Sequence, residues 1–235
     1  MKVLVTGGTG SLGMAIIEEF ASEYDVTFTY HTQKERAIEL ANKFNCKYVH
    51  TSELDNIEFN FDIIINNAAI SGEIDSAENV STESFAEVML TNVVLPFNII
   101  KKSLNYMKSN KFGRIINISS VYAIRVEQEL TAFNTSKYAL VGLTNSIAKE
   151  YAEFGITSNS ILPGTFESEV SNKFAEIYSN NEEEKENYYN NLIKDIPAKR
   201  LGNTKEISKL IKFVASEEAS YINGASITID GAYSV

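Results

Sequence analysis

The chain has 235 residues, enough for one large domain or two small ones with a substantial buried core. Its 44% hydrophobic and 22% charged residues are typical of an ordinary soluble globular protein. The net charge of −10 makes nucleic acid and anionic membrane surfaces unfavourable partners. The chain also has no apolar run of about 18 residues, which argues against a membrane span.

The N-terminus and the cysteine content indicate the cellular compartment of the protein. Residues 1–5 enter a predicted strand at once, which leaves no room for a signal peptide. The single cysteine, Cys46, rules out an intramolecular disulfide and suits a reducing environment. We therefore expect a cytoplasmic protein.

Short apolar runs alternate with segments of helical spacing along most of the chain. Strands are predicted at 2–6, 26–30, 47–50, 61–66, 114–119, 156–162 and 226–230. Helices are predicted at 14–24, 34–44, 81–109 (with a break near Pro96), 136–154 and 205–215. The segment 51–60 is too short for a crossover helix with its loops, so a shortened turn is expected there.

This alternation predicts parallel βαβ units with right-handed crossovers, and hence an α/β fold with a doubly wound, Rossmann-like sheet and helices on both faces. We find no internal repeat and no linker, so residues 1–235 are expected to form a single domain. The strongly polar segment 167–195 is expected to form a lid, and its charge run is read as a solvated face rather than a binding surface.

A glycine cluster separates the first predicted strand from the first helix. Gly7 permits a tight turn, Gly10 lets a pyrophosphate approach the backbone, and Gly13 allows close packing of helix and strand. The anion would sit at the N-terminus of a helix that begins near Ser11. A turn with a purely structural role is the alternative, but the position between strand and helix favours a dinucleotide site.

The residues after the second strand bear on the choice between NAD and NADP. An acidic residue there would bind the adenosine ribose and repel a 2′-phosphate. The chain has Tyr30, His31 and Thr32 instead, with Lys34 and Arg36 close behind. This pattern favours NADP(H) over NAD(H), unless the two cations only form a solvated helix face.

Further motifs follow in a fixed order. They are Asn66-Asn67-Ala68-Ala69, Leu90-Thr91-Asn92, Ile116-Asn117-Ile118-Ser119-Ser120, Phe133-Asn134-Thr135-Ser136-Lys137, Pro163-Gly164-Thr165-Phe166-Glu167-Ser168 and Ile229-Asp230-Gly231-Ala232. Together with the glycine loop they resemble the short-chain dehydrogenase/reductase family over nearly the whole chain. Ser11 departs from that pattern, because many members carry glycine at that place.

The resemblance implies a nicotinamide cofactor, no metal, and a defined set of site residues. The implied cofactor-binding residues are Thr6, Gly7, Gly10, Ser11, Leu12, Gly13, Tyr30, His31, Thr32, Asn67, Ala68, Ala69, Lys137, Pro163, Gly164, Thr165 and Ser168. It also implies that Lys137 holds the nicotinamide ribose, that Ser120 hydrogen-bonds the substrate oxygen, and that Asn92 holds a water molecule that relays protons from Lys137.

One catalytic position breaks the pattern. In the family a tyrosine four residues before the lysine donates the proton to the developing alkoxide, and this chain has Phe133 there. The ring is retained and the hydroxyl is lost. A general acid contributes about 10²–10⁴ in rate, so low residual activity is expected.

Two explanations of Phe133 remain open. Exchanging tyrosine for phenylalanine is the most conservative way to disable such a site, which favours an engineered variant. The alternative is a naturally inactive nucleotide-binding or regulatory protein, or one that uses another donor. Tyr122 is the better candidate for that donor, because Tyr138 should point away from Lys137 on a helix.

The nearest resemblance is to the 3-oxoacyl-(acyl-carrier-protein) reductase-like branch. That branch docks an acidic carrier on basic residues near two places. Here those places hold Lys111 beside Phe112, and Phe154 where an arginine is expected. An acidic surface should not attract such a carrier, so we expect a small free ketone, alcohol or sugar-like substrate.

Arg125 is a candidate for binding a substrate carboxylate or phosphate, or for forming a surface ion pair. The resemblance also implies a homo-oligomer, a tetramer or a dimer.

Overall fold

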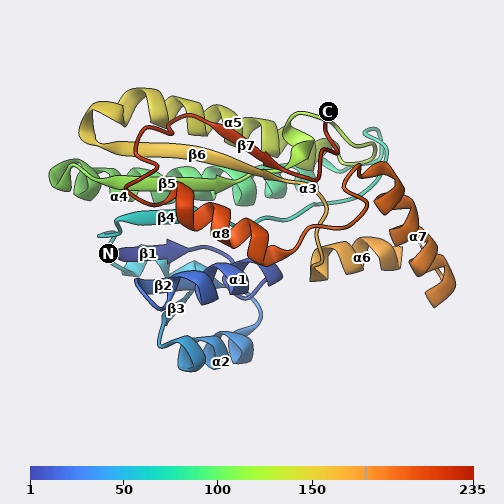
Figure 1. The fold of residues 1–235 in the computed structure, drawn as a ribbon, viewed down its shortest axis with the longest axis horizontal. Coiled ribbons are helices and arrows are strands. Elements are labelled where there is room, and N and C mark those ends of the chain that lie inside the picture. The colour runs from blue at the N-terminus through green and yellow to red at the C-terminus, as the bar shows by residue number, and fades with distance from the viewer. Residues whose placement is uncertain (178) are drawn as a thin grey trace.

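Seven strands form one sheet in this computed structural model, which describes residues 1–177 and 179–235 (Figure 1). The order is β3-β2-β1-β4-β5-β6-β7, with every neighbouring pair parallel. The strands are β1 (Lys2–Val5), β2 (Asp25–Tyr30), β3 (Lys47–His50), β4 (Ile63–Asn66), β5 (Gly113–Ile118), β6 (Ile156–Pro163) and β7 (Ser226–Ile229). The predicted doubly wound parallel sheet is confirmed.

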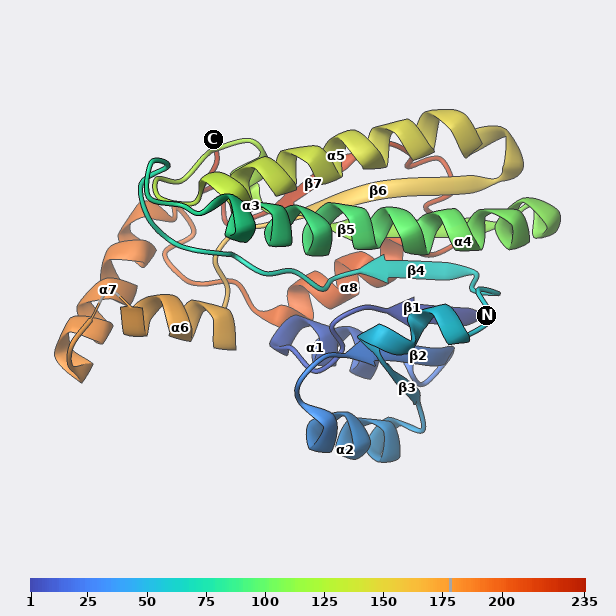
Figure 2. The ribbon, with the colours of Figure 1, turned by 180° about the vertical axis from the view of Figure 1, so that it is seen from behind.

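Helices cover both faces of the sheet (Figures 1 and 2). Helices α1, α2 and α8 pack on one face, and α3, α4 and α5 lie on the other, whereas α6 and α7 stand beyond the carboxyl ends of the strands. The helices are α1 (Ser11–Phe20), α2 (Lys34–Phe44), α3 (Thr82–Met89), α4 (Leu95–Asn110), α5 (Thr131–Tyr151), α6 (Glu169–Ile177), α7 (Glu182–Asp195) and α8 (Thr204–Val214).

Strand β4 shows why the central strands read as unbroken apolar runs. Ile63 and Ile65 pack into the core beneath α1, α2 and α8, while Ile64 packs into the core beneath α4 and α5. All three side chains are fully buried, as expected for a strand covered on both faces. The chain runs outward in opposite directions from β1 and β4, so the carboxyl ends of this pair form the crevice where ligands bind in such sheets.

The connection from β3 to β4 is as short as the sequence predicts. A single 3₁₀ helix, η1 (Thr51–Asn56), occupies it, and Leu54 fills the core at that place. Of the predicted lid, residues 167–177 and 179–195 are described and contain α6 and α7. The part of the predicted lid at position 178 lies outside the described residues.

The starts of α1 and α5 bear on the position of the site residues. Helix α1 begins at Ser11, as the glycine pattern predicts and three residues before the helical spacing that starts at 14, because Gly10 has extended backbone angles and serves as the N-cap directly after the turn. Helix α5 begins at Thr131 rather than 136, although Asn134 and Thr135 are weak helix formers. Phe133 and Lys137 therefore lie one turn apart on the same helix.

The predicted break near Pro96 is instead a π-helical turn, η2 (Leu90–Val94), between α3 and α4. The Leu95 N–H bonds to the Leu90 carbonyl across this wide turn, and Pro96 occupies the first turn of α4, where its missing N–H costs nothing. Such turns interrupt α-helices frequently at functional sites. This one carries Asn92.

A buried polar network ties three strands to α5. Asn66 of β4 donates to the Oδ1 of Asn117 on β5 at 2.8 Å, and Asn117 donates to the Oγ1 of Thr144 on α5 at 2.8 Å. Thr144 in turn contacts the Leu140 carbonyl at 2.8 Å and the hydroxyl of Ser160 on β6 at 2.7 Å. The side chains of Asn117, Thr144 and Ser160 have no exposed surface.

Removing the centre of this network should destabilise the fold. Asn117→Ala deletes two hydrogen bonds and leaves buried groups of Asn66 and Thr144 with fewer partners, which costs about 2–3 kcal/mol of unfolding free energy. Urea unfolding measures this loss. Ser146→Ala is the control, because that exposed hydroxyl on α5 bonds only the Gly142 carbonyl among the described residues. Equal stability of both variants would contradict a structural role for the network.

Candidate active site

The glycine turn leaves the N-terminus of α1 open. Gly7 is left-handed, with φ 67°, and a Cβ at Gly13 would come within 2.2 Å of the Gly7 carbonyl oxygen, so only glycine fits there. A Cβ at Gly10 would have just that carbonyl within 4 Å among the described residues, at 3.6 Å, and no side chain caps the helix. The first-turn amides are therefore available to an anion. The Leu12 side chain points into the core.

Thr6 joins the glycine turn to the loop after β4. Its Oγ1 accepts from the backbone N–H of Asn67 at 2.9 Å and of Ala68 at 3.0 Å. The Asn67 amide donates to the Thr6 and Gly7 carbonyls at 3.0 and 3.1 Å. Ala69, the next residue, is exposed. The predicted cofactor residues of the two loops thus adjoin one another at the β1/β4 crevice.

At the end of β2 the chain changes from core to surface. Tyr30 is buried in the core, while His31 and Thr32 are exposed. The rings of His31 and His50 stack with centroids 5.6 Å apart. Ser52 N–H donates to His50 Nδ1, so His50 Nε2 carries the hydrogen and donates to the His31 carbonyl at 2.8 Å. Sequence reasoning missed His50, whose role depends on the β2–β3 pairing.

The loop after β6, residues 164–168, is held by backbone contacts. Gly164 N–H donates to the Ile229 carbonyl, and a Cβ at Gly164 would lie 2.7 Å from the Asp230 Cβ, so Pro163 leads into a loop that passes very close to β7. The Thr165 carbonyl accepts from Gly202 N–H at 3.1 Å.

Ser168, at the end of that loop, serves as the cap of α6. Its Oγ accepts from Ser171 N–H at 3.0 Å, and Ser171 Oγ donates back to the Ser168 carbonyl at 2.8 Å. The hydroxyl that the family resemblance assigns to the cofactor is therefore engaged in the structure of the lid.

Lys137 is buried and reaches back to the sheet. Its ammonium donates to the Ile118 carbonyl at 2.9 Å and lies 5.2 Å from the centroid of the Phe133 ring. Burial lowers the pKa of Lys137 to about 8. The arrangement places a cation beside the ring where the family has its tyrosine.

Ser120 and Tyr122 lie at the start of the next loop. Ser120 Oγ accepts from Tyr122 N–H at 3.2 Å, at the carboxyl end of β5. The Tyr122 and Phe133 rings meet edge to face with centroids 6.4 Å apart. Tyr122 thus packs against the ring of Phe133, the residue at the position where the family resemblance implies a tyrosine.

Asn92 of η2 forms hydrogen bonds with the loop at Ile70 and with Ser136 of α5. Its Oδ1 accepts from Ile70 N–H, and its amide donates to the Ile70 carbonyl and to Ser136 Oγ, each at 2.9 Å. Ser136 Oγ donates to the Phe133 carbonyl at 2.7 Å. The side chain therefore positions α5 at the turn that holds Phe133, and the proton-relaying water stays a prediction. Ser136 was not singled out in the sequence, since its role depends on this contact.

Arg125 is engaged at the C-terminal tail. Its guanidinium donates to the Tyr233 carbonyl and lies over the Tyr233 ring, 4.3 Å from the centroid. The partner that the structure gives it is thus a carbonyl and a ring rather than the carboxylate of a surface ion pair. A substrate anion would have to compete with this contact.

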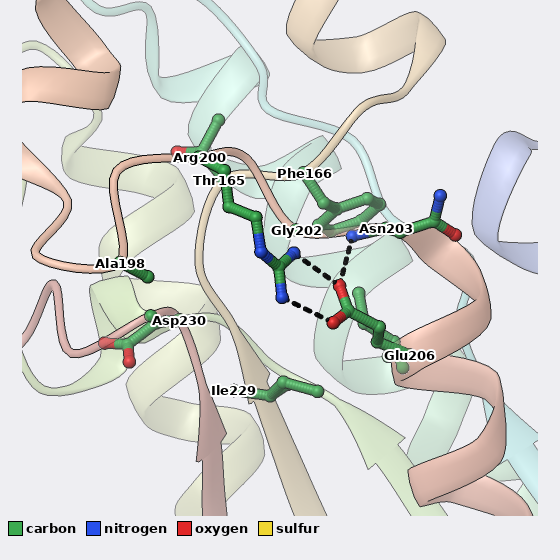
Figure 3. A pocket seen from close by; sticks show the side chains of 11 residues that line it. Thr165, Phe166, Ala198, Arg200, Gly202, Asn203, Glu206, Ile229 and Asp230 are labelled. Atoms are coloured by element: carbon green, nitrogen blue, oxygen red, sulfur yellow. Dashed lines mark hydrogen bonds and ion pairs between the residues drawn. The ribbon is translucent and has the colours of Figure 1, made fainter.

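A small pocket beside the loop after β6 lies apart from the predicted catalytic residues (Figure 3). Arg200 and Glu206 face each other across it in a two-pronged ion pair, and Arg200 holds the pKa of the Glu206 carboxyl down to about 2. Thr165 and Phe166 form another part of its lining. The residues around this pocket thus contact the loop after β6 and hold it in place.

These residues fit a dinucleotide. The open N-terminus of α1 supplies amides for phosphate oxygens, and the buried Lys137 supplies a cation near the ring of Phe133.

Within the described residues, no helix is long and apolar enough to cross a membrane.

Comparisons with known proteins agree with this geometry. The family model described as enoyl-(acyl carrier protein) reductase matches residues 52–234. The 3-oxoacyl-[acyl-carrier-protein] reductase FabG of Aquifex aeolicus is 32% identical over 97% of this chain and 95% of its own length. The corresponding protein of Haemophilus influenzae is 30% identical over 97% of this chain and 96% of its own.

Solved structures resemble the whole chain as well. A levodione reductase superposes with a TM-score of 0.86 at 26% identity, covering 99% of this chain and 97% of that one. A 4-hydroxyisoleucine dehydrogenase mutant complexed with NADH and succinate gives 0.85 at 26% identity, over 99% and 98%.

The lowered pKa of Lys137 makes stability depend on pH. Between about pH 8 and 10.5 the unfolded chain holds a proton on this lysine that the folded chain has released, so stability rises with pH across that window. Relative to Lys137→Met, the wild type should gain about 2–3 kcal/mol between pH 7 and 10.

Urea unfolding of both proteins at several pH values measures this gain. Burial raises the pKa of the Cys46 thiol to about 11, which acts in the opposite direction but cancels in the difference because both proteins contain it. Parallel stability curves for the two proteins would contradict a buried, destabilising ammonium.

Proposed function

The chain belongs to the short-chain dehydrogenase/reductase family, and from this premise we propose that it is an NADP(H)-preferring oxidoreductase for a small carbonyl compound and its alcohol, slowed by the missing hydroxyl at Phe133. The NAD(P)-dependent oxidoreductase chemistry follows from the family. The cofactor preference, the substrate class and the low activity are inferred from residues of this chain.

The observation that carries the proposal is the position of the Lys137 ammonium. It is buried, held at the Ile118 carbonyl, and directed at the ring of Phe133. A cation beside a phenol would favour its ionised form and lower its pKa. The site therefore has the environment that a catalytic tyrosine requires, without the hydroxyl.

The remaining residues can still support part of the chemistry. A bound nicotinamide supplies the hydride. The Ser120 hydroxyl stabilises charge that develops on the substrate oxygen, and Lys137 holds the nicotinamide ribose. The proton has to come from water or from a neighbouring hydroxyl such as that of Tyr122, which accounts for the low rate.

The proposed substrate is small and free rather than carrier-bound. The net charge of −10 repels an acidic carrier protein. At Phe154, where the related branch has an arginine, the ring packs under the Lys108 ammonium, 4.5 Å from its centroid. This contact engages a cation that could otherwise meet an acidic partner.

A second candidate function rests on the same residue. The scaffold around position 133 is complete without the hydroxyl, so a nucleotide-binding or regulatory protein could keep this site unchanged. The natural gene separates the two histories, because a tyrosine codon at 133 supports an engineered reductase and a phenylalanine codon supports the regulatory protein.

We also propose that the chain forms a homo-oligomer through α4 and α5. Leu90, Val94 and Phe97 follow one another at helical spacing along η2 and α4, and all three are exposed. Tyr138 of α5 is exposed as well. An apolar stripe of this kind marks a protein interface.

Restoring the hydroxyl tests the catalytic proposal. Phe133→Tyr should raise the rate of NADPH oxidation with its carbonyl substrate about a hundredfold or more, because a general acid contributes about 10²–10⁴. Rates are measured across small ketones and 3-oxoacyl thioesters, with NADPH and NADH. Cofactor dissociation constants should stay nearly constant, since the ring and Lys137 are unchanged.

Two variants control this comparison. Phe133→Tyr combined with Lys137→Met should lose the gain, and Tyr122→Phe in the original chain tests whether that hydroxyl carries the residual activity. Tight cofactor binding with no gain on any substrate would favour the regulatory protein.

The oligomer proposal predicts a change in mass. Phe97→Glu should convert the assembly to the 26.2 kDa monomer, because it places a carboxylate in the apolar stripe. Phe213→Glu is the matched control, since Phe213 is similarly exposed but lies on α8, on the other face. Light scattering after gel filtration measures both. A monomeric wild type would contradict the proposal.

A further inference from the structure

One residue of the lid touches both helices that begin at the dinucleotide crevice. The backbone N–H of Glu169, the first residue of α6, donates to Ser11 Oγ at 3.0 Å. Its carboxylate accepts from Arg36 Nη1 at 2.5 Å. Figures 1 and 2 both show α6 beside the start of α1.

The two partners of Glu169 mark the two ends of the adenosine diphosphate portion of a dinucleotide. Ser11 opens α1, where pyrophosphate binds by the logic of helix N-termini. Arg36 lies in the first turn of α2, directly after β2, where the adenosine ribose is recognised in this fold. The Glu169 carboxylate therefore sits beside Arg36, one of the two cations after β2 that could meet a 2′-phosphate.

The carboxylate is not required to complete α6. Ser168 and Ser171 already cap that helix with reciprocal hydrogen bonds, and the Glu169 oxygen is directed away from the cap toward Arg36. The Arg36 and Glu169 side chains are 30% and 48% exposed, so water and a ligand can reach the pair.

We infer that Glu169 is a specificity-determining residue that competes with the 2′-phosphate of NADP(H) for Arg36. When the carboxylate holds Arg36, a 2′-phosphate loses its cation and meets a like charge. NAD(H) has no phosphate at that position and is affected less. This inference rests on the proposed dinucleotide-binding function, and it makes the NADP preference weaker than the cations near α2 suggest.

Removing the carboxylate charge tests the competition. Glu169→Gln should shift the ratio of the NADH and NADPH dissociation constants toward NADPH by about two- to fivefold, the scale of a solvent-exposed ion pair. The shift should shrink at high salt. Cofactor fluorescence titration measures both constants.

Glu176→Gln is the matched control. It removes the same charge from the same helix, but Glu176 pairs with Lys185 inside the lid at 3.6 Å rather than with Arg36. An equal shift in this variant would assign the effect to general lid charge and overturn the inference.

Arg36 supplies the second arm of the experiment. Arg36→Gln should weaken NADPH binding more than NADH binding, and in that background Glu169→Gln should leave the ratio unchanged, because the two side chains act as a pair. An unchanged ratio in Glu169→Gln alone, with both cofactors bound, would overturn this inference only. Failure of the wild type to bind either dinucleotide would overturn the proposed function with it.

Discussion

The position of α5 on the sheet depends on buried hydrogen bonds as well as on the apolar packing of Ile147. The side of α5 that faces the sheet carries Ser136, Lys137 and Thr144, all buried. Thr144 forms hydrogen bonds with Asn117 of β5 and Ser160 of β6. The Lys137 ammonium donates to the Ile118 carbonyl, and the Ser119 hydroxyl donates to the Lys137 carbonyl. Apolar packing tolerates small sliding of a helix, whereas directional bonds fix its register. The places of Phe133 and Lys137 follow from this constraint.

The same scaffold explains how the site keeps its geometry with phenylalanine at position 133. Asn92 and Ser136 hold the turn at Phe133 through its backbone carbonyl, and Tyr122 packs against the Phe133 ring. None of these contacts uses a hydroxyl at position 133. The chemistry can therefore fail at this residue while the binding geometry is preserved.

Sequence patterns predicted the sheet and the glycine turn because both depend on local spacing. The alternating apolar runs predicted a doubly wound parallel sheet, and the need for glycine at Gly7 and Gly13 follows from the turn itself. The start of α5 was missed because Asn134 and Thr135 have weak helix propensity and only tertiary contacts compensate for it. The Glu169–Arg36 pair joins positions 133 residues apart, which no local pattern reveals.

The buried ammonium of Lys137 is the strongest argument that cofactor binding matters in this chain. Burial lowers its pKa to about 8, so a charged lysine at neutral pH is held there against its own desolvation. An apolar side chain of similar volume would stabilise the fold more. With Phe133 in place the lysine has no tyrosine to activate. Among the roles that the family resemblance gives it, holding the nicotinamide ribose and supplying the proton relay at Asn92 remain. A buried cation that costs stability and keeps these roles supports the proposed dinucleotide site.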